Sequence, residues 1–142
     1  YTQGTFAEAA RVLFHITGEQ SYMDKAAQVL LYGLESNRTT SGGLLRSEGE
    51  NMDQSIFKAV FIPYAVNYVL DADADVNSAG RIKEKLLKNA EAMYKHIDRT
   101  YYPSMSCNYW WGEAVPQGIR VSMGAQASGA SLMENVARMV KK

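Results

Sequence analysis

The side chains that could do chemistry in this sequence are carboxylates, amides and aromatic rings, and they gather in three stretches. They are Tyr1, Gln3, Glu48, Glu50, Asp53, Gln54, Trp110, Trp111, Glu113 and Gln126. Aromatic rings stack on the apolar C–H faces of sugars, and carboxylates and amides form directed hydrogen bonds with hydroxyl groups. This combination favours carbohydrate binding. We take seven as candidate glycan-binding residues: Tyr1, Gln3, Asp53, Gln54, Trp110, Trp111 and Gln126.

Several of these residues also have a purely structural interpretation. Trp110 and Trp111 suit the anchoring of a long loop onto helices. Asp53 stands at the start of an apolar stretch, where an aspartate caps a helix and the helix dipole favours its ionised form. Lys58 is the single charge within that stretch and needs a partner once buried. For Lys58 we expect a structural ion pair with a carboxylate rather than a contact with sugar.

Hydrophobic periodicity predicts five helices and no strand to position these residues. The predicted helices span residues 3–17, 21–35, 53–70, 77–99 and 122–139, and Gly18 is suited to end the first. The first, third and fifth are apolar over most of their surface, whereas the second and fourth are about half polar. A helix that is apolar all round is buried, and an amphipathic one covers it. The sequence therefore predicts an all-α fold of inner–outer helix pairs, either a solenoid or a closed α/α toroid.

The connections between these helices alternate in length. Residues 18–20 and 71–76 form short inner-to-outer turns, whereas residues 36–52 and 100–121 form long outer-to-inner loops. Long loops in compact domains are usually functional or disordered, and these are too aromatic for simple disorder. In an alternating array, all long loops lie on one rim, together with the first residues of the inner helices. We expect the functional site on that rim.

Composition excludes several classes of function. The chain has 142 residues and a net charge of zero, which argues against a nucleic-acid partner. One cysteine excludes an intrachain disulfide and a multi-cysteine zinc site, and no apolar run is long enough to span a membrane. The acidic turn at residues 71–75 lacks the glycine and glutamate of an EF-hand, because Val76 and Ile82 stand there. We expect no metal and no cofactor.

Four segments, in order along nearly the whole chain, resemble glycoside hydrolase family 76. They are residues 1–4 (YTQG), 17–22 (TGEQSY), 53–61 (DQSIFKAVF) and 126–128 (QAS). The third is similar to the family's D-x-x-x-F-K-G-[IV]-F segment, the most specific of the four. The sequence departs from the family pattern at Thr2, Ala59 and Pro63, where Asn, Gly and Arg are usual.

The resemblance implies an (α/α)6 toroid of twelve helices that hydrolyses α-1,6-mannan by a retaining mechanism, with two consecutive aspartates as catalytic groups. No two aspartates are adjacent in this sequence. Five helices also cannot close a twelve-helix ring, and Tyr1 is not an initiating methionine. We therefore expect residues 1–142 to form the C-terminal half of the domain, a partial toroid without catalytic residues. The catalytic pair would belong to the N-terminal half, upstream of Tyr1.

The resemblance also implies a partner and a location, and two alternative interpretations stand beside it. The expected partners are α-mannan, or another mannose-containing glycan, and the N-terminal half of the same domain. Mannan is an extracellular polymer, so the resemblance implies an extracytoplasmic location. One alternative is another glycan-active enzyme with an α/α toroid, of the glycuronyl hydrolase or sugar epimerase type. A second is a non-catalytic helical binding scaffold of the tetratricopeptide kind, although its loops would all be short.

Overall fold

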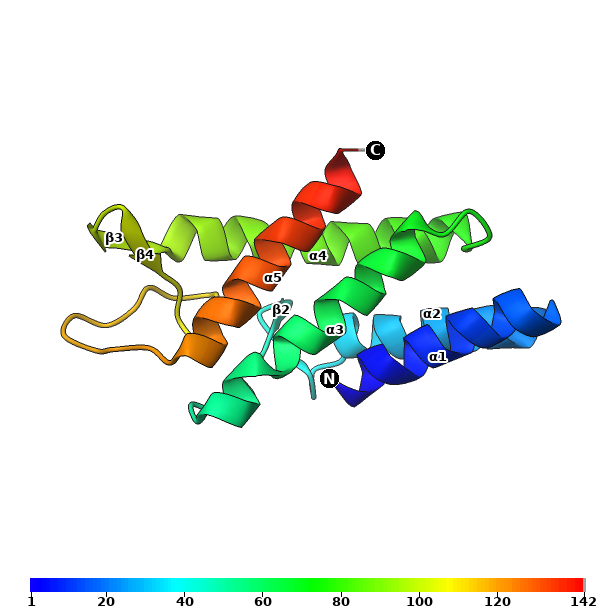
Figure 1. Ribbon diagram of the computed structural model, residues 1–142, viewed down its shortest axis with the longest axis horizontal. Coiled ribbons are helices and arrows are strands. Elements are labelled where there is room, and N and C mark those ends of the chain that lie inside the picture. The colour runs from blue at the N-terminus through cyan, green and yellow to red at the C-terminus, as the bar shows by residue number, and fades with distance from the viewer. Residues whose placement is uncertain (142) are drawn as a thin grey trace.

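The computed structural model describes residues 1–141, and five helices dominate it (Figure 1). They are α1 (Thr2–Thr17), α2 (Gln20–Glu35), α3 (Met52–Leu70), α4 (Val76–His96) and α5 (Met123–Val140). The predicted all-α class and the five helices are confirmed. Most boundaries lie within one residue of those predicted, and Gly18 ends α1 in the left-handed conformation with φ 73°. The fourth helix was predicted too long, because the chain leaves it at His96 and enters a strand.

The prediction of no strand was wrong, because two small hairpins follow the outer helices. The first pairs β1 (Thr40–Ser41) with β2 (Leu44–Leu45) across Gly42 and Gly43, which both have positive φ. The second pairs β3 (Asp98–Tyr101) with β4 (Ser104–Ser106). Two glycines between two short strands are a recognised signal for a two-residue hairpin turn, so the sequence contained the evidence for the first hairpin.

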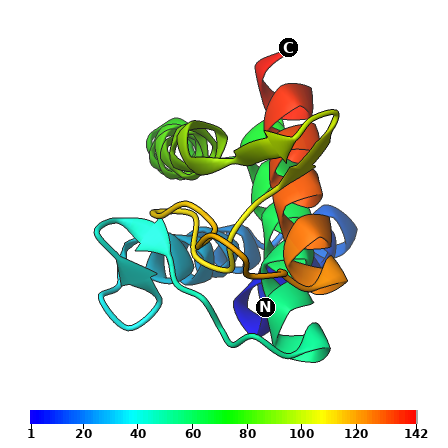
Figure 2. The same cartoon turned by 90° about the vertical axis from the view of Figure 1, so that its left-hand side faces the viewer.

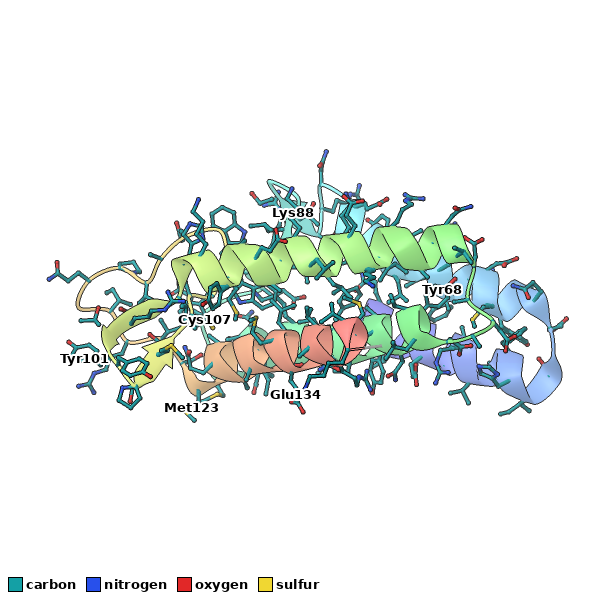
Figure 3. All side chains as sticks on the ribbon, turned by 90° about the horizontal axis from the view of Figure 1, so that it is seen from above. Tyr68, Lys88, Tyr101, Cys107, Met123 and Glu134 are labelled. Atoms are coloured by element: carbon teal, nitrogen blue, oxygen red, sulfur yellow. The ribbon has the colours of Figure 1, made fainter. Side chains whose placement is uncertain are left out.

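The helices form two layers, with α1, α3 and α5 on one side and α2 and α4 on the other (Figures 1 and 2). The core between them is apolar, and in the view from above Tyr68 and Cys107 lie between α4 and the layer of α3 and α5 (Figure 3). Met123 and Glu134 lie on the opposite side of α5 and are exposed. The inner–outer arrangement predicted from polarity is therefore present.

Small residues bring α3 and α5 close together. Hydroxyl groups of α5 then bond carbonyl oxygens of α3: Ser128 Oγ donates to Ser55 O at 2.7 Å, and Ser131 Oγ donates to Ala59 O at 3.2 Å. The second bond has a specific reason. Pro63 has no N–H to donate to Ala59, four residues earlier, and Ser131 supplies a donor instead. The proline is thus accommodated within α3 by its neighbour.

Phe61 connects α3 to the α1–α2 pair. A Cβ on Gly4 would lie 2.8 Å from the Phe61 Cα, and one on Gly33 would lie 2.9 Å from its ring. Phe61 therefore fits a notch formed by two glycines, one on each helix of the pair. The rest of α1 was expected to be mostly buried, and this expectation was wrong. Only Gly4, Ala7 and Ala10 are buried there, because α1 packs on α2 and α3 along one face and leaves the rest of its surface uncovered.

Several apolar side chains of α1, α3 and α5 are left exposed. Phe6, Val12, Leu13 and Ile16 of α1 are 40–73% exposed, and Ile56 and Met133 are 39% and 36% exposed. None of the helices within residues 1–141 is long and apolar enough to cross a membrane. Exposed apolar area that follows successive helices is typical of a surface that another protein segment covers.

Candidate glycan-binding rim

In Figure 1 each of α1, α3 and α5 begins on its left-hand side; the starts of α3 and α5 lie with the β3–β4 hairpin toward the left end, and the start of α1 lies nearer the middle, beside the β1–β2 hairpin. The short α1–α2 and α3–α4 turns lie at the other end. The rim predicted from loop lengths is therefore formed. Figure 2 looks onto it and shows the loop between β4 and α5 lying across it, in front of the helices.

A cavity of about 170 Å³ opens on this rim between α1, α2, α3 and the loop that precedes α3. Its lining residues are Tyr1, Gln3, Gly33, Arg38, Thr39, Leu45, Arg46, Ser47, Glu48, Lys58 and Phe61. Tyr1 is 42% exposed, and its ring packs on Phe57 with 4.2 Å between ring centroids. Two predicted residues, Tyr1 and Gln3, thus line the cavity, and Tyr1 keeps part of its ring free for stacking.

The loop that forms one wall of the cavity is held by hydrogen bonds to its backbone. Asn89 Oδ1 of α4 accepts from Leu45 N at 2.9 Å, which anchors β2. Arg46 donates to Thr40 O at 2.8 Å and to Asn37 O at 3.1 Å. These bonds place the backbone of residues 45–48 beside the first turn of α1 and fix the shape of the cavity.

Asp53 and Gln54 lie on the same rim, outside the cavity lining. Asn51, and not Asp53, is the N-cap of α3, since its side chain accepts from Gln54 N at 2.8 Å. The capping role considered for Asp53 is therefore wrong. The Asp53 carboxylate is exposed in the first turn, and no hydrogen bond within residues 1–141 uses it. An exposed carboxylate without a structural partner is available to a ligand.

The aromatic loop packs inward. Trp111 is 1% exposed, and its ring lies 3.9 Å from the Lys58 Nζ, whereas Trp110 is half-buried. The loop is anchored at the start of α5, because Tyr109 Oη accepts from Ser122 N at 3.0 Å. The Trp111 ring is therefore covered by protein in this structure. It packs beneath the rim and holds the loop in place.

The side-chain amide of Gln126 is likewise engaged with the protein. Its Oε1 accepts from Cys107 N at 2.9 Å, and its Nε2 donates to Cys107 O at 3.0 Å. This reciprocal pair fastens the segment after β4 to α5. Burial raises the pKa of the Cys107 thiol, which leaves that group a poor nucleophile at neutral pH.

The expected ion pair of Lys58 was wrong. Lys58 is 5% exposed, and its Nζ donates to Tyr109 O at 2.5 Å beside the Trp111 ring. Among residues 1–141, none of the ion pairs includes it. Burial lowers the pKa of Lys58 to about 8. The sequence could not reveal this environment, because Tyr109 and Trp111 lie about fifty residues away along the chain.

Three groups at the opposite end approach one another closely enough to hold a metal ion: His15, Asp71 and Asp73. Asp71 Oδ2, however, already accepts from Arg11 and lies 2.7 Å from His15 Nε2. Burial alone would raise the pKa of Asp71, but the hydrogen bonds from His15 and Arg11 hold it below its ordinary value. The arrangement ties α1 to the α3–α4 turn and is explained without an ion.

Comparison with known proteins supplies the family. The model of glycosyl hydrolase family 76 matches residues 1–142. The GH76A α-1,6-mannanase from Salegentibacter sp. HEL1_6 is 30% identical, with a TM-score of 0.85 over 96% of this chain and 38% of that one. Its inactive variant, in which two consecutive aspartates are replaced by alanine, is known in complex with α-1,6-mannotetrose, and the TM-score is 0.84.

The other comparisons are less specific. The Lin0763 protein from Listeria innocua has 24% identity and a TM-score of 0.79 over 96% of this chain and 36% of that one, and it supports the fold alone. No curated protein matches the chain. The chain thus spans well under half the length of these solved structures. The alignment confirms the predicted partial α/α toroid, and the chain belongs to glycosyl hydrolase family 76.

Proposed function

We propose that the protein containing this chain hydrolyses α-1,6-mannosidic bonds of α-mannan, and that residues 1–142 supply part of its glycan-binding rim. The observation that carries the proposal is the 30% identity to an α-1,6-mannanase across 96% of the chain. The rim chemistry agrees with it, because Tyr1 offers a partly free ring beside Gln3 and Glu48 in a cavity. Such a site suits a sugar, which needs both stacking and hydrogen bonds.

The catalytic groups belong, in this proposal, to another part of the domain. A retaining glycosidase needs two carboxyl groups about 5–5.5 Å apart, one as nucleophile and one as acid and base. This chain has no adjacent aspartates, whereas the inactive mannanase variant replaces two consecutive ones. We therefore assign residues 1–142 to the C-terminal half of the toroid and the aspartate pair to the N-terminal half.

The exposed apolar residues of α1, α3 and α5 support this division. An uncovered row that includes Phe6, Val12, Leu13 and Ile16 is unfavourable in water, and covering it would stabilise the protein by roughly 25 cal/mol per Å². The N-terminal half of the same domain is the partner that completes a ring of inner helices. Because α-mannan is an extracellular polymer, the proposal includes an extracytoplasmic location.

Hydrolysis of α-1,6-mannan by the full-length protein tests the proposal. Products are followed by chromatography, and the anomer released first is identified by proton NMR. Release of short α-1,6-mannooligosaccharides with the α anomer formed first supports a retaining mannanase. Binding of mannan without cleavage would indicate a lectin-like protein in place of an enzyme. A protein that neither binds nor cleaves mannan would contradict the proposal. Replacement of both catalytic aspartates by asparagine is the matched control.

A further inference from the structure

Lys58 places a buried cation at the wall of the rim cavity. Its side chain has three N–H donors, and within residues 1–141 one hydrogen bond uses them, to Tyr109 O. Glu48, which also lines the cavity, attracts this ammonium but forms no ion pair with it, and the loss of hydration on burial is the larger effect. A ligand that carries negative charge into the cavity would compensate for that loss.

The rest of the cavity is also cationic. Arg38 and Arg46 line it together with Lys58, and Glu48 is its one carboxylate in the described part of the chain. Three cations against one anion make the cavity a positive site in a chain whose net charge is zero. Arg46 uses Nε and one terminal nitrogen on backbone carbonyls, while Arg38 is exposed, and none of the hydrogen bonds within residues 1–141 engages its guanidinium.

We infer that this cavity binds an anionic group, a phosphate or a carboxylate, through Lys58 and Arg38. Arginine and lysine recognise these groups by charge-assisted hydrogen bonds, which are about twice as strong as neutral ones. At about 170 Å³ the cavity has room for one compact group of a longer glycan. The Glu48 carboxylate can accept from hydroxyl groups, so the preferred ligand carries hydroxyls beside its charge. The source of the anion rests on the proposed function: an acidic substituent on the mannose-containing glycan.

The experiment measures binding of four probes to the full-length protein by calorimetry: inorganic phosphate, mannose 6-phosphate, glucuronic acid and mannose. We expect mannose 6-phosphate or glucuronic acid to bind with a dissociation constant of about 1 mM or lower, which corresponds to a binding free energy of about −4 kcal/mol or more favourable. Mannose should bind at least about tenfold more weakly than the better acidic sugar. Tight binding of inorganic phosphate alone, with both acidic sugars rejected, would assign the site to free phosphate and contradict the glycan source.

Two variants connect the binding to this cavity. Lys58→Met should weaken binding of the acidic probe at least about tenfold, and Arg38→Gln about threefold to tenfold, because each removes one charge-assisted bond. Arg38 is exposed, so its replacement keeps the test valid even where Lys58→Met fails to fold. Lys95→Gln removes an equal charge from an exposed position on α4 and should leave binding unchanged.

Three results would overturn the inference: no binding of any anion, equal binding of mannose and the charged probes, or anion binding that survives Arg38→Gln and Lys58→Met alike. Mannan hydrolysis is measured separately on the same protein samples. A protein that cleaves mannan and binds no anion contradicts the anion site alone. A protein that binds the anion and leaves mannan intact contradicts the proposed function alone.

Discussion

Lys58 should make the free energy of unfolding rise with pH, because its pKa is lower in the folded protein than in the unfolded chain. Its pKa falls from 10.5 to about 8 because burial disfavours the charged form. Between these two values the unfolded chain binds more protons than the folded protein, so the free energy of unfolding rises with pH in this window. The full difference corresponds to about 3 kcal/mol, since a tenfold change in proton affinity is about 1.4 kcal/mol.

The measurement is urea unfolding of the full-length protein and of Lys58→Met at a series of pH values from about 7 to about 9.5. Over that pH range Lys58 should raise the free energy of unfolding by about 2 kcal/mol, and the remainder of its effect should follow above about pH 9.5. Burial raises the pKa of Cys107 and of Tyr68, which opposes this trend at high pH. The difference between wild type and variant, and not the wild-type curve, therefore isolates the lysine.

The matched control is Lys95→Met, which replaces an exposed lysine on α4 and should follow the wild-type curve. A difference between wild type and Lys58→Met that stays constant across the pH range would refute the reasoning. It would show that Lys58 keeps an ordinary proton affinity in the folded protein, and that its ammonium is not desolvated beside Trp111.

Other predictions concern the packing and the rim. Gly4→Ala should destabilise the protein by about 1–3 kcal/mol in urea unfolding, because the added Cβ would lie 2.8 Å from the Phe61 Cα; an unchanged midpoint would mean that α1 and α3 can separate at no cost. Asn51→Ala should cost about 1 kcal/mol through loss of the α3 cap, and Asn51→Asp should restore most of it. Asp53→Asn should lower mannan turnover or binding well beyond any change in melting temperature, whereas a change confined to stability would remove Asp53 from the glycan site.

The helices and the rim could be predicted from sequence because they rest on local patterns. The alternation of apolar and amphipathic helices predicted the two layers. The alternation of short and long connections predicted that α1, α3 and α5 begin on one rim. Gly18 ends α1 because glycine readily adopts the left-handed conformation. The polarity and the end of each helix depend on residues within about one or two helical turns, and the order of helices and loops along the chain does the rest.

The environments of single side chains could not be predicted in the same way. Asn51 took the cap because the helix begins one residue earlier than its apolar pattern indicates. Lys58 and Trp111 pack together although they lie far apart in sequence, and the side-chain amide of Gln126 forms hydrogen bonds with the Cys107 backbone. Such contacts arise from how the long loop folds back on the helices, which no local pattern records.

We propose above all that the rim formed by α1, α3 and the adjoining loop holds a mannan chain. This proposal is tested most directly by a crystal structure of the full-length protein, with the proposed catalytic aspartate pair replaced, in complex with α-1,6-mannotetraose. We expect a sugar ring against Tyr1, with hydrogen bonds to Gln3, Asp53 or Gln54. An oligosaccharide bound away from this rim, with all four side chains free of contact, would contradict it.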